Sequence, residues 1–355
     1  MSVKTDNKLK FKISRGVKTS LILSAFIMST QAIGKSSPYL VNVLDGNYTT
    51  NSDIVNNSTT SEVGGIGVYS NDIIITNKHS IDVNTSAENR NAYGIKITTS
   101  VASDIKVLND GDIETNASGD SSRASAISSY QLNNSTISNT ETITAIAEYA
   151  TGIETGDLIN STISNYKTIK VNGYRTNGIR VDDLDNSTIS NSGLISIEGN
   201  YVVLGIIADS LTDSNITNSG SIIVKENIPL SVGIVVADGG SGYITNSGTI
   251  TAQKTIWTYG FNGDIINTQT GILNGHIYAG SSNFLNEGEM NIPISQIISD
   301  EIKGEVGPDI SEVKNFTQTA KGTLGIKLDI DDEGKGKYSN INVYNKAKLA
   351  DGTTI

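Results

Sequence analysis

The chain has 355 residues, a formal net charge of −11, no cysteine and only two histidines. Without cysteine it forms no disulfide and no thiolate metal site, and two histidines cannot build a multi-histidine metal centre. An acidic chain lacks the basic face that nucleic acid requires, and its 35 glycines and 37 asparagines favour turns over helices.

Residues 1–32 have the three parts of a secretory signal peptide. Six basic residues between Lys4 and Lys18 precede an apolar run, Leu21–Met28, and the small residues that follow allow cleavage after Ala32 or near Gly34. The run is too short to cross a bilayer core, which needs about 20 apolar residues. We therefore expect an exported protein at the cell surface, in the outer membrane or outside the cell. Its exported part would carry a formal charge of −16.

Residues 61–295 contain a repeat anchored on asparagine. The segment Asn-Ser-Thr-Ile-Ser-Asn occurs three times, beginning at Asn134, Asn160 and Asn186. The anchors recur every 19 to 32 residues: Asn77, Asn109, Asn139, Asn165, Asn191, Asn218, Asn246, Asn267 and Asn286. An apolar residue lies two positions before each anchor, and another lies four positions after it in eight of the nine. After Asn267 the second position slips by one, to Ile272. A third apolar strip follows six of the anchors by 13 to 17 residues: Gly94-Ile95, Gly152-Ile153, Gly178-Ile179, Gly205-Ile206, Gly233-Ile234 and Gly260-Phe261.

Each repeat therefore holds three short runs with the alternation of β-strands, and none of them can bury its apolar face alone. Stacking one repeat on the next buries these faces, so the sequence predicts an all-β fold. We expect a right-handed, single-stranded parallel β-helix of nine to ten coils, with strands about 4.8 Å apart along its axis. The anchor asparagines are expected to tolerate left-handed backbone angles at the corner and to donate their amides to the next coil as a buried ladder.

Three further segments flank the repeats. Residues 33–60 are polar and poorly periodic, and they are predicted to form an N-terminal cap over the first coil. Residues 296–312 break the repeat with charge, glycine and proline, and are predicted to be a linker. Residues 313–355 are predicted to form a C-terminal β segment of three strands, with a charged hairpin tip at Asp331–Lys337.

The C-terminal segment resembles the passenger end of bacterial autotransporters, the type V secretion family. The resemblance lies in Asn315-Phe-Thr-Gln-Thr-Ala-Lys-Gly-Thr-Leu-Gly-Ile-Lys-Leu, in the strand Tyr338–Val343 and in the turn Leu349–Thr353. It implies a surface-displayed or released passenger of the pertactin-like or pectin-lyase-like β-helix type, with an autochaperone-like C-terminal cap. Such passengers continue into an outer-membrane barrel, which this chain lacks, so we expect a fragment or a split or truncated gene.

Two groups of residues imitate catalytic or metal sites. The order His79, Asp104 and Ser121 imitates a serine-protease triad, but a triad must converge in space, and His79 lies inside a repeat while Ser121 lies in a loop. Asp329-x-Asp-x-Glu-Gly334 opens like a calcium loop, but its twelfth position is Asn340 rather than the glutamate of an EF-hand. We expect turn residues in both places, no catalytic residue and no cofactor.

Five aspartates follow the third strip, each four or five residues after its glycine: Asp157, Asp183, Asp209, Asp238 and Asp264. If the coils stack in register, these carboxylates would lie about 4.8 Å apart along one edge, where they would raise one another's pKa or recruit a cation. The favoured interpretation is aspartate as a turn residue that bonds its own backbone. The weaker hypothesis is a divalent-cation strip, and no other metal site is expected.

Two classes of function fit these features. The favoured one is a non-enzymatic adhesin or self-association rod that binds surface glycans or proteins of host or bacterium, or itself. The alternative is a polysaccharide lyase or hydrolase of the pectate-lyase type, which needs clustered carboxylates beside basic residues. Only Arg175 and Arg180 lie near such a cluster, at Asp182, Asp183 and Asp185. A truncated, non-functional passenger is the third possibility.

Overall fold

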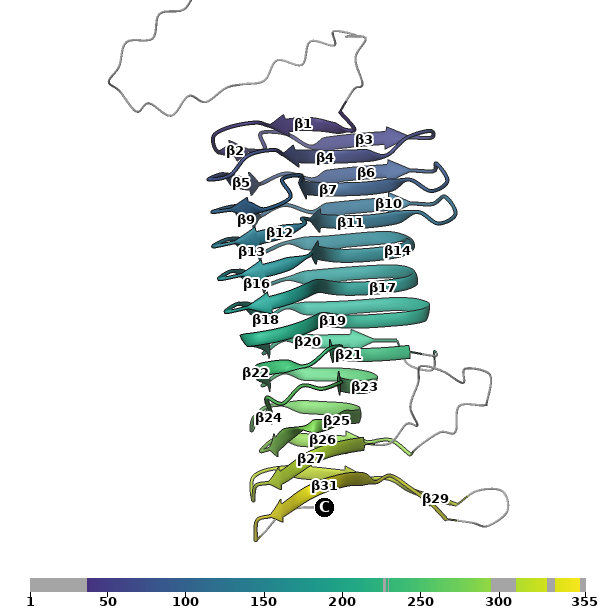
Figure 1. Cartoon of the computed structure of the whole chain (residues 1–355). Coiled ribbons are helices and arrows are strands. Elements are labelled where there is room, and N and C mark those ends of the chain that lie inside the picture. Colours follow the sequence, from purple (N-terminus) through teal and green to yellow (C-terminus); the bar gives the residue numbers. More distant parts are fainter. Residues whose placement is uncertain (1–36, 226–227, 229, 295–310, 331–335, 352–355) are drawn as a thin grey trace, which may run out of the picture. The chain divides into compact units, whose positions relative to one another are not determined.

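The computed structural model describes residues 37–225, 228, 230–294, 311–330 and 336–351. In this part of the chain 29 strands join one sheet whose pairings are all parallel, and they stack as a β-solenoid of about 10 turns with no helix (Figure 1). The predicted parallel β-helix architecture is thus confirmed. The predicted signal peptide, residues 1–32, lies outside the described residues, as does most of the predicted linker 296–312.

Each turn passes through three strand columns, which we call columns 1, 2 and 3. Column 1 begins with β2 (Tyr48–Thr49), which has no anchor asparagine. The strands that follow it in column 1 each end on an anchor: β5 (Ile74–Asn77), β9 (Lys106–Asn109), β13 (Thr136–Asn139), β16 (Thr162–Asn165), β18 (Thr188–Asn191) and β24 (Asp264–Asn267). Column 2 contains β3 (Ile54–Ser58), β6 (Ile81–Thr85), β10 (Ile113–Ala117), β20 (Ser221–Val224), β26 (Glu289–Ile292) and β28 (Thr323–Ile326). Column 3 contains β1 (Tyr39–Val43), β4 (Val63–Val68), β7 (Asn91–Ile97), β11 (Arg123–Ser128) and β21 (Leu230–Val236), with the short β8 (Ala102–Ser103), β12 (Gln131–Asn133) and β15 (Asp157–Ile159) at its end.

The remaining strands of the solenoid bend through more than one column. They are β14 (Thr142–Thr155), β17 (Thr168–Asp185), β19 (Leu194–Asn218), β22 (Gly240–Asn246), β23 (Thr249–Thr258), β25 (Ile272–Asn286), β27 (Ser311–Gln318) and β31 (Ile341–Leu349). The pairing of β17 with β19 shows the register: Ile169 faces Ile195, Ile179 faces Ile206 and Leu184 faces Leu211. Identical apolar positions therefore stack directly on one another from coil to coil.

The core is a set of stacked isoleucine columns inside the solenoid. The apolar residues two positions before the nine anchors are 0–1% exposed, and so are Ile143, Ile169 and Ile195 on column 2. Burying each such side chain contributes about 1.5–3 kcal/mol of transfer free energy. One prediction was wrong in detail, because Leu273 and not Ile272 faces the core, in register with Ile250 and Met290. The turn from Asn267 to Leu273 is two residues longer than the corresponding turn from Asn246 to Ile250. A difference of two keeps the inward-facing position inward, whereas a difference of one would turn the side chain outward.

The buried asparagine ladder is confirmed. Each anchor donates its Nδ2 to the Oδ1 of the anchor in the next coil, at 2.7–2.9 Å, from Asn77 to Asn286. Thr50 begins the series by donating to Asn77, and Gln318 ends it by accepting from Asn286. Every anchor is at most 1% exposed, so the ladder satisfies amides that would otherwise be costly to bury.

The left-handed corner belongs to a different asparagine from the one expected. Asn134, Asn160 and Asn186, which open the Asn-Ser-Thr-Ile-Ser-Asn segments, have φ values of 47–48°, whereas the anchors do not have positive φ. The serines that follow them are buried and join successive coils, for example Ser135 N–H to Ser161 Oγ at 2.8 Å. The segment therefore supplies in turn a left-handed corner, a serine bridge, a core isoleucine and a ladder amide.

The glycines of the third strip provide space rather than unusual backbone angles. A Cβ added at Gly178 would lie 2.5 Å from the carbonyl oxygen of Gly205 and 2.6 Å from Cγ2 of Ile195. Gly260-Phe261 does not belong to this strip, contrary to expectation. Ile256 is the residue in register with Ile234, while Phe261 bridges to Gly240.

The solenoid continues into both segments that flank the repeat region. Within the predicted cap, β1, β2 and β3 pair in parallel with β4, β5 and β6, so the described residues from 37 to 60 form the first coil. At the C-terminus, β27, β28 and β31 continue the solenoid. The hairpin is present as the antiparallel pair β29 (Leu328–Ile330) and β30 (Gly336–Tyr338), and its tip at 331–335 lies outside the described residues.

Candidate functional site

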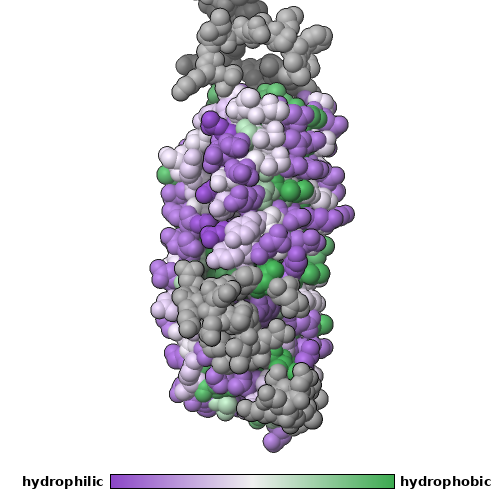
Figure 2. Space-filling model, turned by 90° about the vertical axis from the view of Figure 1, so that its right-hand side faces the viewer, coloured by the Kyte–Doolittle hydropathy of each residue, from purple (hydrophilic) through white to green (hydrophobic). Residues whose placement is uncertain are grey.

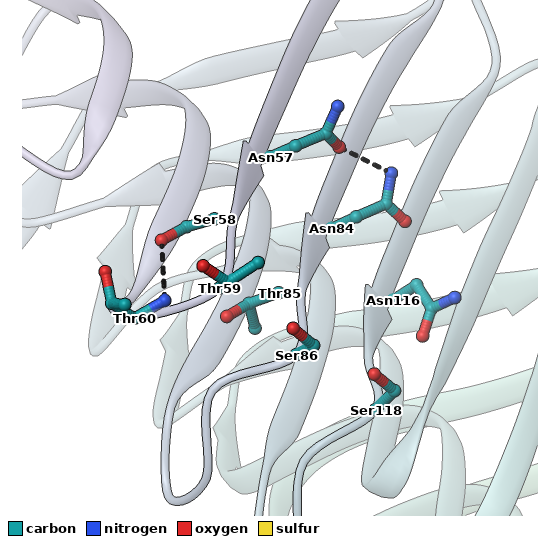
Figure 3. A pocket seen from close by; sticks show the side chains of 9 residues that line it. All are labelled: Asn57, Ser58, Thr59, Thr60, Asn84, Thr85, Ser86, Asn116 and Ser118. Atoms are coloured by element: carbon teal, nitrogen blue, oxygen red, sulfur yellow. Dashed lines mark hydrogen bonds between the residues drawn. The ribbon is translucent and has the colours of Figure 1, made fainter.

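An open groove follows the bend between columns 2 and 3 on the first three coils. It has a volume of about 520 Å³ and is lined by nine residues: Asn57, Ser58, Thr59, Thr60, Asn84, Thr85, Ser86, Asn116 and Ser118. We call it the corner groove (Figure 3). Its side of the solenoid is predominantly hydrophilic over the upper coils (Figure 2).

A row of three asparagines forms the column 2 side of the corner groove. Asn57 pairs with Asn84 across β3 and β6, and Asn84 pairs with Asn116 across β6 and β10, so their side chains follow one another along neighbouring strands (Figure 3). Asn84 Nδ2 donates to Oδ1 of Asn57 at 2.9 Å and to Oδ1 of Asp82 at 2.6 Å. With both amide hydrogens in use, Asn84 presents its own Oδ1 as an acceptor.

The other side of the corner groove is a loop held by hydroxyl groups. Ser58 Oγ lies 2.9 Å from Ser61 Oγ and accepts the Ser61 backbone N–H at 3.0 Å. Thr85 Oγ1 donates to the Ser61 carbonyl at 3.0 Å. These bonds fix the loop, while the exposed side chains of Thr59, Ser86 and Ser118 face solvent.

The chemistry of the corner groove is that of hydrogen bonding without proton transfer. All nine lining side chains are neutral amides or hydroxyls, which donate and accept hydrogen bonds and do not titrate near neutral pH. Asp82 reaches the groove only through its bond to Asn84. The arrangement can therefore bind a polyhydroxylated ligand, but it offers no acid–base pair for catalysis.

The residues that imitate a triad do not meet. His79 lies at the turn between columns 1 and 2, where its Nδ1 is 3.9 Å from Oδ1 of Asp53. Asp104 occupies the left-handed corner before column 1, with φ of 57°. Ser121 lies at the bend before column 3, and its backbone N–H donates to Glu148 Oε2 at 2.7 Å. His79, Asp104 and Ser121 thus lie at three different corners of the solenoid.

The predicted aspartate strip is only partly formed. Asp157 and Asp183 each precede the paired leucines Leu158 and Leu184 at the end of column 3. Asp209 precedes Ser210, which is in register with Asp183 and donates its Oγ to that carboxylate at 2.5 Å.

Asp238 lies in the coil after Asp209, and its backbone N–H donates to the Asp209 carbonyl at 2.6 Å. Asp264 is different, because it lies in β24 of column 1 and accepts a hydrogen bond from Asn283 at 2.8 Å. The five-membered strip therefore loses Asp264, and Asp209 lies one residue out of register with Asp183. Among the described residues no group of three or more acidic or histidine side chains is arranged to hold a metal ion.

Electrostatics distinguish two of these carboxylates. Burial, followed by the Asp183 and Asp182 carboxylates, raises the pKa of Asp157 above its usual value. Burial and the Asp182 carboxylate likewise raise the pKa of Asp209, although Arg180 opposes them. Arg180 itself is paired with Asp182, at 3.1 Å. The charge cluster at the end of column 3 is thus a crowded acidic surface with one arginine.

The raised pKa predicts a pH dependence for Asp209→Asn. Because the folded-state pKa of Asp209 lies above the unfolded value, the folded state binds more protons between the two, and stability falls as pH rises through that interval. Thermal unfolding should therefore show the variant melting above the wild type at pH 7. The difference should vanish below the ordinary aspartate pKa of about 3.9. Glu114→Gln, which removes an exposed carboxylate from column 2, is the matched control. Parallel pH profiles for wild type and Asp209→Asn would contradict the prediction.

The single tryptophan of the chain and the calcium-like run are two further features of the sequence. Trp257 lies on the outer face of column 3, where it packs with a small apolar cluster around Leu204, Val232 and Val235 and meets Tyr278 edge to face. The calcium-like run from Asp329 falls mostly on residues outside those described. No helix in the described ranges is long and apolar enough to span a membrane.

The corner groove was not predicted, although the sequence contains its signal. An asparagine lies three residues after the first core isoleucine of column 2 in three successive coils, as Ile54/Asn57, Ile81/Asn84 and Ile113/Asn116. These outward residues are not part of the buried apolar pattern that defines the repeat.

The fold and the groove define a class: a parallel β-solenoid with a neutral, polar corner groove on its first coils. No family model, no curated protein and no solved structure matches the chain.

Proposed function

We propose that this chain is a non-enzymatic, glycan-binding adhesin. The observation that carries the proposal is the corner groove, whose lining consists entirely of hydroxyl and amide groups. Saccharide hydroxyls both donate and accept hydrogen bonds, and the groove offers both partners in a row that repeats with the coil spacing of about 4.8 Å. Loops supported by a rigid scaffold are common sites of binding.

We propose a cell-surface setting for this activity. The predicted signal peptide supports export, and the resemblance of residues 313–355 to passenger ends supports display or release by type V secretion. A solenoid of about 10 turns is the kind of architecture expected of such a passenger. An outer-membrane barrel would be the partner that carries it to the surface.

A triple variant tests the binding proposal. Asn57→Ala, Asn84→Ala and Asn116→Ala together remove the amide row but leave the core and the ladder intact. On an array of neutral and acidic oligosaccharides, the wild type should bind a limited set of glycans, and the triple variant should lose at least tenfold in affinity for them. The control Asn172→Ala removes an exposed asparagine from the same row of column 2, two coils beyond Asn116. Binding that survives in the triple variant, or falls equally in the control, would refute the assignment.

A polysaccharide lyase or hydrolase is the second candidate. The observation that favours it is the crowded cluster of Asp157, Asp182 and Asp209 beside Arg180, in which burial raises the pKa of two carboxylates. Perturbed carboxylates beside an arginine can serve as acid and base. The adhesin proposal predicts no release of reducing sugar or unsaturated product from acidic or neutral polysaccharides. Release that Asp209→Asn abolishes would favour the enzyme.

A further inference from the structure

Four side chains alternate along the bend between columns 2 and 3, one on each of four successive coils. They are Arg123, Tyr149, Arg175 and Tyr201, and we call them the arginine–tyrosine strip. The strand register places Arg123 beside Tyr149 and Tyr149 beside Arg175. Tyr201 lies next to Val202, the partner of Arg175. With coils about 4.8 Å apart, the strip is about 14 Å long.

Cation–π and ring-stacking contacts join neighbouring side chains of the strip. The Arg123 guanidinium carbon is 5.7 Å from the centre of the Tyr149 ring, and that of Arg175 is 5.1 Å from the centre of Tyr201. Tyr174 stacks on Tyr201 with the ring centres 5.2 Å apart and the planes 4° from parallel. Guanidinium groups fixed over rings keep their N–H edges available and lose less freedom on binding.

The positive charges of Arg123 and Arg175 are exposed and are not paired with a carboxylate of any described residue. Arg180, by contrast, is paired with Asp182. The nearby Glu148 carboxylate accepts the backbone N–H of Ser121. At physiological salt, charges more than about 8 Å away are largely screened, so the negative net charge of the chain does not cancel this local patch.

The strip continues the line of the corner groove. Ser118, at the end of the groove, and Arg123, at the start of the strip, flank the same bend on the coil of β10 and β11. A polymer lying along the solenoid axis would therefore pass from neutral amides to stacked tyrosines and arginines.

We propose that the arginine–tyrosine strip binds an acidic polysaccharide, pairing Arg123 and Arg175 with its carboxylates and stacking a sugar ring on the face of the exposed Tyr174 that is turned away from Tyr201. Guanidinium groups bind carboxylates in a bidentate manner, and aromatic faces bind the apolar faces of sugar rings. The inference rests on the proposed glycan-binding function and adds the class of ligand.

The test compares one polymer with and without its charge. Binding of the full chain is measured to polygalacturonate and to its methyl ester, which has the same sugar ring without the free carboxylate. The wild type should bind polygalacturonate at least tenfold more tightly, and Arg123→Gln/Arg175→Gln should lose at least tenfold in affinity. Tyr174→Leu should weaken binding to both polymers, because it removes the exposed ring that contacts the sugar. Lys346→Gln/Lys348→Gln, which removes two positive charges from column 1, should bind as the wild type does. Circular dichroism confirms that each variant is folded.

The outcomes separate the two proposals. Equal loss in the arginine and lysine variants would overturn the strip, since it would show attraction by overall charge alone. Failure to bind polygalacturonate, with array glycans still bound through the corner groove, would overturn the strip and leave the proposed function standing. Failure to bind either probe or any array glycan would overturn both.

Discussion

Replacing Asn165 by alanine is expected to lower the free energy of unfolding by about 2–4 kcal/mol, because it breaks the asparagine ladder on both sides. The Nδ2 of Asn139 would lose its acceptor Asn165 Oδ1 at 2.8 Å and keep the longer bond to the Thr168 carbonyl at 3.4 Å. The Oδ1 of Asn191, 2.7 Å from Asn165 Nδ2, would lose its donor. All three residues are fully buried, so water cannot replace these bonds. The shift in the urea unfolding midpoint measures the effect.

Asn172→Ala is the matched control for the ladder variant. Asn172 lies on the next strand of the same coil and is exposed, so its removal should change stability by no more than about 0.5 kcal/mol. If both variants lose the same amount, or if Asn165→Ala is neutral, the ladder does not stabilise the stack.

Gly178→Ala is expected to cost about 3 kcal/mol, at the upper end of the range for overpacking. The added methyl would lie 2.5 Å from the Gly205 carbonyl oxygen, which belongs to the backbone of the next coil and cannot move aside alone. It would also lie 2.6 Å from Cγ2 of the buried Ile195. The coils would have to separate locally, which a lower urea midpoint would report.

Gly280→Ala is the corresponding control, since it adds the same methyl group where space can be made. The nearest atom is Cε2 of Tyr344 at 3.0 Å, at the far end of an exposed side chain that can rotate away. Its midpoint should stay near that of the wild type. A Gly178→Ala variant as stable as Gly280→Ala would show that the glycine strip is not a spacing requirement.

The buried half of this fold could be predicted because its signal repeats. Ile137 and Asn139 face inward in their coil, and the same pair recurs as Ile163 with Asn165. Because the coils stack in register, each coil needs an inward side chain of the same volume and a ladder amide at the same position. The prediction is wrong where one residue type has two structural roles, because the left-handed corner belongs to Asn134 and not to the anchor asparagine.

The outward half was predicted less well, for a physical reason. Outward side chains are not constrained by packing, so neither their identity nor their register is visible without knowing which strands pair. Asp264 seemed to follow the same strip as Asp238 but lies in column 1. An interval of 26 positions separates Arg123, Tyr149 and Arg175, and the same interval separates the anchors Asn139 and Asn165. The strand register shows that this interval places the three side chains beside one another on successive coils.

Hydrogen–deuterium exchange, measured with and without the best glycan from the array, would locate the bound glycan on the solenoid. We predict that the glycan slows exchange in three peptides far apart in sequence, containing residues 57–60, 84–86 and 116–118, because one groove brings them together. Slower exchange at the end of column 3, around Asp157, Asp183 and Asp209, with none in these three peptides, would contradict glycan binding in the corner groove and place the ligand on the acidic surface instead.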